Sequence, residues 1–186
     1  MGFFDSARKM VLVFFILALL PAAVFSEAGK PKAAQPSPAA VAEADRLFNA
    51  GFVLSQQGRM DEAIAKTWEA LKLDPNHPGA RYNMGVFMSG KGKMDEAIKH
   101  MRVAAKLSPE NVNAHYNLAY FLQTKGKNDE AAKEYRQVLK RSPDHQNAHW
   151  NLGIILTSQG KLKEASTHCK KVAALNPKLS GPVCKQ

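Results

Sequence analysis

The sequence lacks the short motifs by which many enzymes are recognised. It contains no Gly-rich phosphate loop, no His-Glu-x-x-His segment and no Gly-x-Ser-x-Gly segment. His145 and His149 are four residues apart, but the pair lacks the further ligands that a closed zinc site needs. Paired carboxylates such as Asp61-Glu62 recur along the chain and belong to helix starts. We therefore expect no catalytic activity, no metal site and no cofactor.

Cysteine is scarce, with only Cys169 and Cys184 among 186 residues. The two do not form a Cys-x-x-Cys motif, which argues against redox catalysis. In an oxidising compartment they are able to pair, and a disulfide closing a loop of about 15 residues contributes about 3 kcal/mol in the chain-entropy model. The alternative is two unrelated thiols, with Cys169 as a small buried residue. We favour the disulfide, which would hold the C-terminal tail against the last helix.

Long apolar runs are confined to the N-terminus. The basic pair Arg8-Lys9 precedes an apolar run over residues 10–25, and residues suited to signal cleavage stand before Glu27. This run is slightly shorter than the about 17–25 residues that span a bilayer as a helix. We interpret residues 1–26 as a signal peptide; the alternative is an uncleaved anchor.

Export determines the expected location and the expected partners. A cleaved signal predicts a periplasmic or secreted protein, and an uncleaved one predicts an inner-membrane-anchored protein facing the periplasm. Residues 27–43, rich in Ala, Pro and Lys, are expected to form an extended linker. The chain is basic, with 26 Lys and Arg against 16 Asp and Glu. Because an exported protein does not meet the genome, we expect no nucleic-acid partner. The basic residues either form a solvated surface, which is the more common case, or meet acidic proteins or anionic lipid headgroups.

The strongest positive signal is a 34-residue repeat marked by proline. The prolines at this spacing are Pro75, Pro109, Pro143 and Pro177. They define four units, 44–77, 78–111, 112–145 and 146–179, followed by a tail at 180–186. A period near 34 residues is typical of stacked helix pairs, each too small to bury its apolar face alone.

Each unit contains residues typical of the starts and ends of two helices. Small residues recur at its eighth and twentieth positions, as at Gly51 and Ala63, where two helices can cross closely. A glycine at the fifteenth position ends the first helix, and in the first three units an acidic pair follows in the first turn of the second. Proline disfavours helical geometry in the residue before it, so the second helix ends there.

These units resemble the tetratricopeptide repeat. The resemblance rests on Tyr82-Asn83-Met84-Gly85, Tyr116-Asn117-Leu118-Ala119, Trp150-Asn151-Leu152-Gly153, the Asp-Glu-Ala triplets at 61–63, 95–97 and 129–131, and the four prolines. It covers residues 44–179 and implies an all-α solenoid of antiparallel helix pairs. Thr67, where a large apolar residue is usual, and Lys163, which replaces aspartate, depart from the pattern.

The resemblance also implies a concave groove lined by the first helices. Carried over by position, its lining is Phe48, Asn49, Phe52, Tyr82, Asn83, Val86, Tyr116, Asn117, Tyr120, Trp150, Asn151 and Ile154. This lining is aromatic and nearly uncharged, and it lacks the lysines and arginines with which some family members grip a terminal carboxylate. The repeated asparagines suit either a clamp on a peptide backbone or packing between units.

We therefore expect an exported scaffold or adaptor that binds a peptide or protein segment in the concave groove. By analogy with exported proteins of this kind, it resembles assembly factors of the cell envelope. Two alternatives stay open: a structural array that associates with itself as a homo-oligomer, and a membrane-surface adaptor that uses lysines and arginines on the convex side of the second helices.

Overall fold

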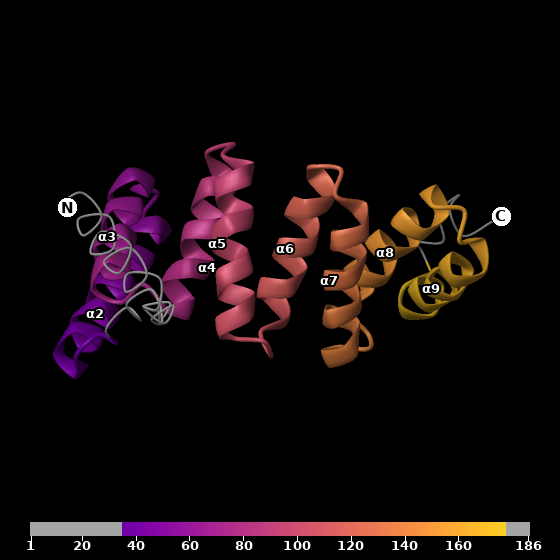
Figure 1. The fold of residues 1–186 in the computed structure, drawn as a ribbon. Helices are drawn as coiled ribbons and strands as arrows, with labels where there is room; N and C mark the ends of the chain where they lie inside the picture. Colours follow the sequence, from indigo (N-terminus) through magenta and orange to yellow (C-terminus); the bar gives the residue numbers. More distant parts are fainter. Residues whose placement is uncertain (1–34, 178–186) are drawn as a thin grey trace, which may run out of the picture. The chain divides into compact units, whose positions relative to one another are not determined.

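The computed structural model describes residues 35–177, and these residues fold into helices without any strand (Figure 1). The helices form consecutive pairs: α2 (Pro38–Gln56) with α3 (Met60–Leu73), α4 (Pro78–Gly90) with α5 (Met94–Leu107), α6 (Val112–Thr124) with α7 (Asn128–Arg141), and α8 (Gln146–Ser158) with α9 (Leu162–Leu175). Each helix packs against its pair partner and against the next helix in the chain. The all-α solenoid is confirmed. The predicted signal peptide, the tail at 180–186 and Cys184 lie outside the described residues, so the Cys169–Cys184 disulfide stays a prediction.

Glycine closes the turn inside every pair. Gly58, Gly92, Gly126 and Gly160 adopt φ values of 77°, 74°, 73° and 72°. Residues other than glycine rarely adopt this left-handed backbone conformation without strain. The predicted glycines therefore end the first helices because only glycine tolerates the positive φ of the turn. The second helices then end at residues 73, 107, 141 and 175, each two residues before a repeat proline.

The first helix starts earlier than the linker prediction allowed. Residues 38–43 were assigned to the extended linker, but they form the first turns of α2. The side chain of Ser37 accepts a hydrogen bond from the Ala40 amide, and Pro38 stands at the first helical position. Both features favour a helix start, and the alanines that follow are strong helix formers.

Small side chains allow the helices of each pair to approach closely. Ala63, Ala97 and Ala131 are fully buried, and Ala165 is nearly so. Thr67 is also fully buried, and its hydroxyl donates to the Ala63 carbonyl at 2.8 Å, which satisfies the polar group where a large apolar residue was expected. Ala50 is exposed, although Met84, Leu118 and Leu152 at the same position of the later units are buried, because no helix of the described residues precedes α2 in the array.

Polar contacts at equivalent positions fix the register between neighbouring pairs. In the second, third and fourth pairs, the side chain of the residue before the turn glycine donates a hydrogen bond to an aspartate of the preceding pair. The three contacts are Lys91–Asp61 (2.6 Å), Lys125–Asp95 (3.1 Å) and Gln159–Asp129 (2.9 Å). These contacts are exposed, so each contributes at most about 1 kcal/mol. Lys163 occupies the aspartate position in the last pair, where the described residues contain no following pair to need one.

Two histidines join α8 to α9, and one of them, His168, makes the last pair of helices sensitive to acid. His149 Nε2 lies 2.8 Å from the Pro143 carbonyl oxygen and donates to it, and His149 Nδ1 lies 2.8 Å from His168 Nδ1. Burial, followed by the proximity of His149, lowers the pKa of His168 below its ordinary 6.5, and Arg136 adds to this effect while Glu164 opposes it.

We expect stability to fall on acidification. Because the pKa of His168 is lower in the folded chain, the unfolded chain binds more protons as pH drops below about 6.5. The stability from this group is complete above that pH and is lost as pH falls toward the folded pKa. Urea denaturation at pH 7.5, 6.5 and 5.5 measures this slope, and the H168Q variant is expected to show a shallower one. Equal slopes for both proteins would contradict the assignment.

Candidate functional site

The predicted groove residues surround a pocket between α4 and α6. The pocket has a volume of about 450 Å³. Its lining is Val86, Ser89 and Gly90 from α4, and Tyr116, Asn117, Tyr120 and Phe121 from α6. The structure thus brings four predicted residues, Val86, Tyr116, Asn117 and Tyr120, into one site. Ser89, Gly90 and Phe121 complete the lining and are not among the predicted groove residues.

Glycine at position 90 helps to keep this pocket open. A Cβ atom built on Gly90 would meet nothing within 4 Å, and the equivalent position in the other units is Gln56, Thr124 or Ser158. Gly90 is not among the described glycines with positive φ, so a side chain is compatible with its backbone. The absence of a side chain here therefore leaves space rather than relieving strain.

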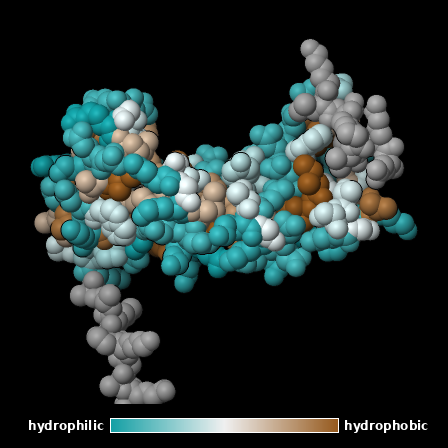
Figure 2. Space-filling model, turned by 90° about the horizontal axis from the view of Figure 1, so that it is seen from above, coloured by the Kyte–Doolittle hydropathy of each residue, from teal (hydrophilic) through white to brown (hydrophobic). Residues whose placement is uncertain are grey.

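The apolar groove residues differ in how far they reach solvent. Phe52, Val86 and Tyr120 are 47%, 38% and 51% exposed. Phe48, Tyr82, Tyr116, Trp150 and Ile154 are half-buried. On the face drawn in Figure 2, hydrophobic side chains come to the surface as separate patches within a mainly hydrophilic surface. The exposed members are the side chains that a partner could cover at little cost to the fold.

The repeated asparagines bond to tyrosines of the array. Asn117 Nδ2 donates to the Tyr82 hydroxyl at 2.9 Å, one unit back. Asn151 Nδ2 lies 2.9 Å from the Tyr135 hydroxyl and 3.5 Å from that of Tyr116. These bonds favour the packing role for Asn117 and Asn151. Asn49 is exposed and is not engaged in this way by any described contact.

The first two units lack the asparagine–tyrosine hydrogen bond that joins the later ones. Phe48 occupies the position of Tyr82 and Tyr116 but has no hydroxyl, and Asn83 Nδ2 is buried without a hydrogen-bond partner. A buried unpaired donor costs about 1–3 kcal/mol. The Asn83 amide thus lacks a partner because Phe48 has no hydroxyl oxygen to accept its hydrogen bond.

We expect F48Y to stabilise the protein by about 1 kcal/mol, because the new hydroxyl can accept from Asn83 as Tyr82 accepts from Asn117. Urea denaturation measures the gain. The double variant F48Y/N83A is the control, and the gain should be absent from it relative to N83A alone. A loss of stability in F48Y would show that the ring lacks room for the oxygen beside Gly79.

Two histidines, His77 and His145, lie directly before first helices and cap them. His77 Nδ1 accepts from the Ala80 amide at 3.1 Å, and its Nε2 donates to Asp45 at 2.9 Å. His145 caps α8 in the same way and stacks on the groove residue Tyr116, with ring centroids 4.9 Å apart. The available signal was their position directly before a helix start, a place more typical of Ser, Thr, Asp or Asn.

The electrostatics of the pocket are those of a neutral site. No lysine, arginine, aspartate or glutamate lines it. Burial raises the pKa of Tyr116 above its ordinary 10.0, so its phenol keeps its proton at neutral pH and remains a donor. Residues 35–177 contain no cluster of three or more His, Cys, Asp or Glu side chains able to hold a metal ion. No helix within that range is long and apolar enough to cross a bilayer.

The family follows from a sequence profile. The profile described as "Tetratricopeptide repeat" matches residues 48–112 and 116–180. The chain belongs to the tetratricopeptide repeat family. Its helix pairs, turn glycines and repeat prolines are therefore those of a tetratricopeptide array.

Solved structures with similar folds include several tetratricopeptide arrays. MamA from Desulfovibrio magneticus is 21% identical, with a TM-score of 0.66 over 73% of this chain and 77% of that one. PilF from Pseudomonas aeruginosa is 20% identical, with a TM-score of 0.61 over 75% and 64% of the two chains. A tetratricopeptide repeat protein from Parabacteroides merdae is 19% identical, with a TM-score of 0.67 over 77% and 57%. These likenesses show the fold. Comparison with curated protein sequences finds no match.

Proposed function

We propose that this tetratricopeptide protein is a non-catalytic scaffold that binds an uncharged peptide or protein segment across α4 and α6. The observation that carries the proposal is the 450 Å³ pocket formed by predicted groove residues. Its volume falls within the range of about 300–1,000 Å³ typical of ligand sites. Its aromatic walls offer large contact areas, and the Ser89 and Asn117 side chains offer polar atoms at its edge.

The uncharged lining of the pocket restricts which kinds of peptide segment can bind there. Without a lysine or arginine, the pocket has nothing to pair with a terminal carboxylate, and without an acid it has nothing to pair with a cation. A charged group would lose hydration there without compensation. An apolar or aromatic side chain would instead contact Val86, Tyr116 and Tyr120 and exclude water from them.

A photo-crosslinking experiment in cells tests this proposal. A benzophenone amino acid replaces Tyr120 in one strain and the exposed Lys99 of α5 in another, and crosslinked proteins are identified by mass spectrometry. We expect a discrete product from position 120 that is absent at position 99. Combining the label at position 120 with G90Q, which places a side chain in the pocket, should lower its yield by about tenfold or more.

The matched control is Q56G, which exchanges the same two residue types at the equivalent position of the first unit and should leave the yield unchanged. Circular dichroism establishes that G90Q and Q56G remain folded. Identical products at positions 99 and 120, or a yield that G90Q leaves intact, would contradict the groove.

We further propose that the protein is exported. It is either released into the periplasm or anchored in the inner membrane by an uncleaved signal segment. The support is the basic pair and apolar run of residues 1–26, followed by a linker. The intact mass of the protein purified from its native cells decides between the two forms. A chain beginning at Glu27 shows cleavage, and a chain retaining residues 1–26 in the membrane fraction shows an anchor. Full-length protein in the cytoplasm would contradict export.

A further inference from the structure

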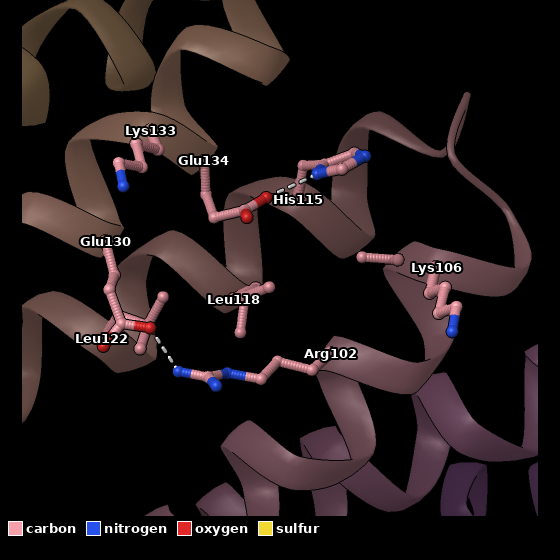
Figure 3. A pocket seen from close by; sticks show the side chains of 9 residues that line it. Arg102, Lys106, His115, Leu118, Leu122, Glu130, Lys133 and Glu134 are labelled. Carbon is pink, nitrogen blue, oxygen red and sulfur yellow. Dashed lines mark hydrogen bonds and ion pairs between the residues drawn. The ribbon is translucent and has the colours of Figure 1, made fainter.

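A second pocket lies between α5, α6 and α7, and the proposed function does not use it. Its volume is about 390 Å³. Its lining is Arg102, Ala105, Lys106, His115, Leu118, Leu122, Glu130, Lys133 and Glu134 (Figure 3). Tyr116 and Tyr120 face the groove, whereas Leu118 and Leu122 face this hollow. Because an α-helix turns by about 100° per residue, the two pockets lie on roughly opposite sides of α6.

One small residue explains why the hollow exists at this boundary. Ala105 stands at the twenty-eighth position of its unit, where the neighbouring units carry Leu71 and Leu139. Leu71 is buried and Leu139 is partly buried against the core. The missing leucine side chain leaves a hollow above an apolar floor of Ala105, Leu118 and Leu122, which are themselves only 6%, 3% and 1% exposed.

The carboxylates of the pocket already have partners. Arg102 pairs with Glu130 on one side, and His115 Nδ1 meets Glu134 at 2.6 Å on the other (Figure 3). His115 Nε2 is also engaged, at 2.9 Å from the Pro109 carbonyl oxygen. These contacts hold the walls in place and give each carboxylate a hydrogen-bond partner within the pocket.

The two lysines of the pocket have no such partner. Lys106 and Lys133 are exposed on opposite sides of the hollow (Figure 3), and neither forms an ion pair with any residue of 35–177. The uncompensated charge at the rim is therefore positive. An apolar floor between two such lysines is complementary to an apolar side chain flanked by acidic groups.

We propose that this pocket is a second docking site, for an acidic segment of a partner protein that inserts a leucine or phenylalanine side chain between Lys106 and Lys133. The parts of this chain outside the described residues do not supply such a segment. They contain only Asp5 and Glu27 as acidic residues, and neither is flanked by a second acid. With the groove on the other side of α6, the array would hold two different segments at once.

Chemical-shift mapping on the ¹⁵N-labelled full chain in detergent tests the site. The probe is the capped tripeptide acetyl-Glu-Leu-Glu-amide, with acetyl-Gln-Leu-Gln-amide as the neutral control. We expect saturable shifts for backbone amides of residues that line the pocket on α5, α6 and α7, and affinity weaker by about fivefold or more for the neutral peptide. Shifts confined to Tyr116 and Tyr120, or equal affinity for both peptides, would overturn the proposal.

Two variants locate the site, and the array supplies a matched control. A105L restores the leucine of the neighbouring units and should abolish saturable binding while circular dichroism stays unchanged. K106Q/K133Q should weaken binding by about fivefold or more. K72Q/K99Q removes the equivalent lysines at the preceding boundary, where Leu71 fills the place of Ala105, and should have no effect. Binding that survives both A105L and K106Q/K133Q would overturn the proposal independently of the groove, which G90Q tests.

Discussion

Replacing Tyr135 with alanine is expected to lower the free energy of unfolding by about 3–5 kcal/mol, as for other large buried aromatic side chains. Tyr135 is fully buried in α7. Its hydroxyl donates to Gln123 Oε1 at 2.8 Å and accepts from Asn151 Nδ2 at 2.9 Å. One side chain therefore connects α6, α7 and α8, and its loss leaves both a cavity and two amide groups without their partner.

The Y135F variant separates the two parts of this loss. Its ring fills the same space, so only the hydrogen bonds disappear, and we expect a cost of about 1–3 kcal/mol. Burial raises the pKa of Tyr135, so the phenol stays protonated and able to donate throughout the neutral range. Urea denaturation followed by circular dichroism measures both variants. A Y135F cost equal to that of Y135A would show that packing contributes little.

The fold was predictable from sequence because its signals are local and repeated. The turn glycines need a backbone conformation that other residues avoid, and each repeat proline stands two residues after the end of a second helix. A single unit would have given weak evidence for either. In-phase repetition makes the helix boundaries unambiguous, except at Pro38, where the capping residue Ser37 lies outside the repeating units.

The details of the site were less predictable because they depend on contacts between units. The aromatic positions of the groove could be assigned by resemblance, but the pairing of Asn117 with Tyr82 joins residues 35 positions apart in sequence. The pocket beside Lys106 depends on Ala105 being smaller than Leu71 and Leu139. This difference in size produces a pocket only when α5, α6 and α7 pack together. Histidine caps were missed because histidine is an uncommon residue at that position.

The same substitution at two equivalent glycines is expected to have opposite effects. Gly51 and Gly153 both occupy the eighth position of a unit, inside α2 and α8. A Cβ atom on Gly51 would lie 2.8 Å from Thr67 Oγ1 and 3.0 Å from the Ala63 carbonyl oxygen. A Cβ atom on Gly153 would meet nothing nearer than His168 Cβ, at 3.8 Å.

We expect G51A to lower the free energy of unfolding by about 1–3 kcal/mol, because the Ala63 carbonyl oxygen belongs to the backbone and Thr67 is held by its hydrogen bond to it. We expect G153A to raise it by about 0.5–1 kcal/mol, because alanine favours a helix interior and the contact is ordinary. Urea denaturation of the two variants measures this difference directly. Because helix propensity acts equally on both, any difference between them reports the distance between α2 and α3 compared with that between α8 and α9. Equal effects of the same sign would contradict the tighter crossing at Thr67.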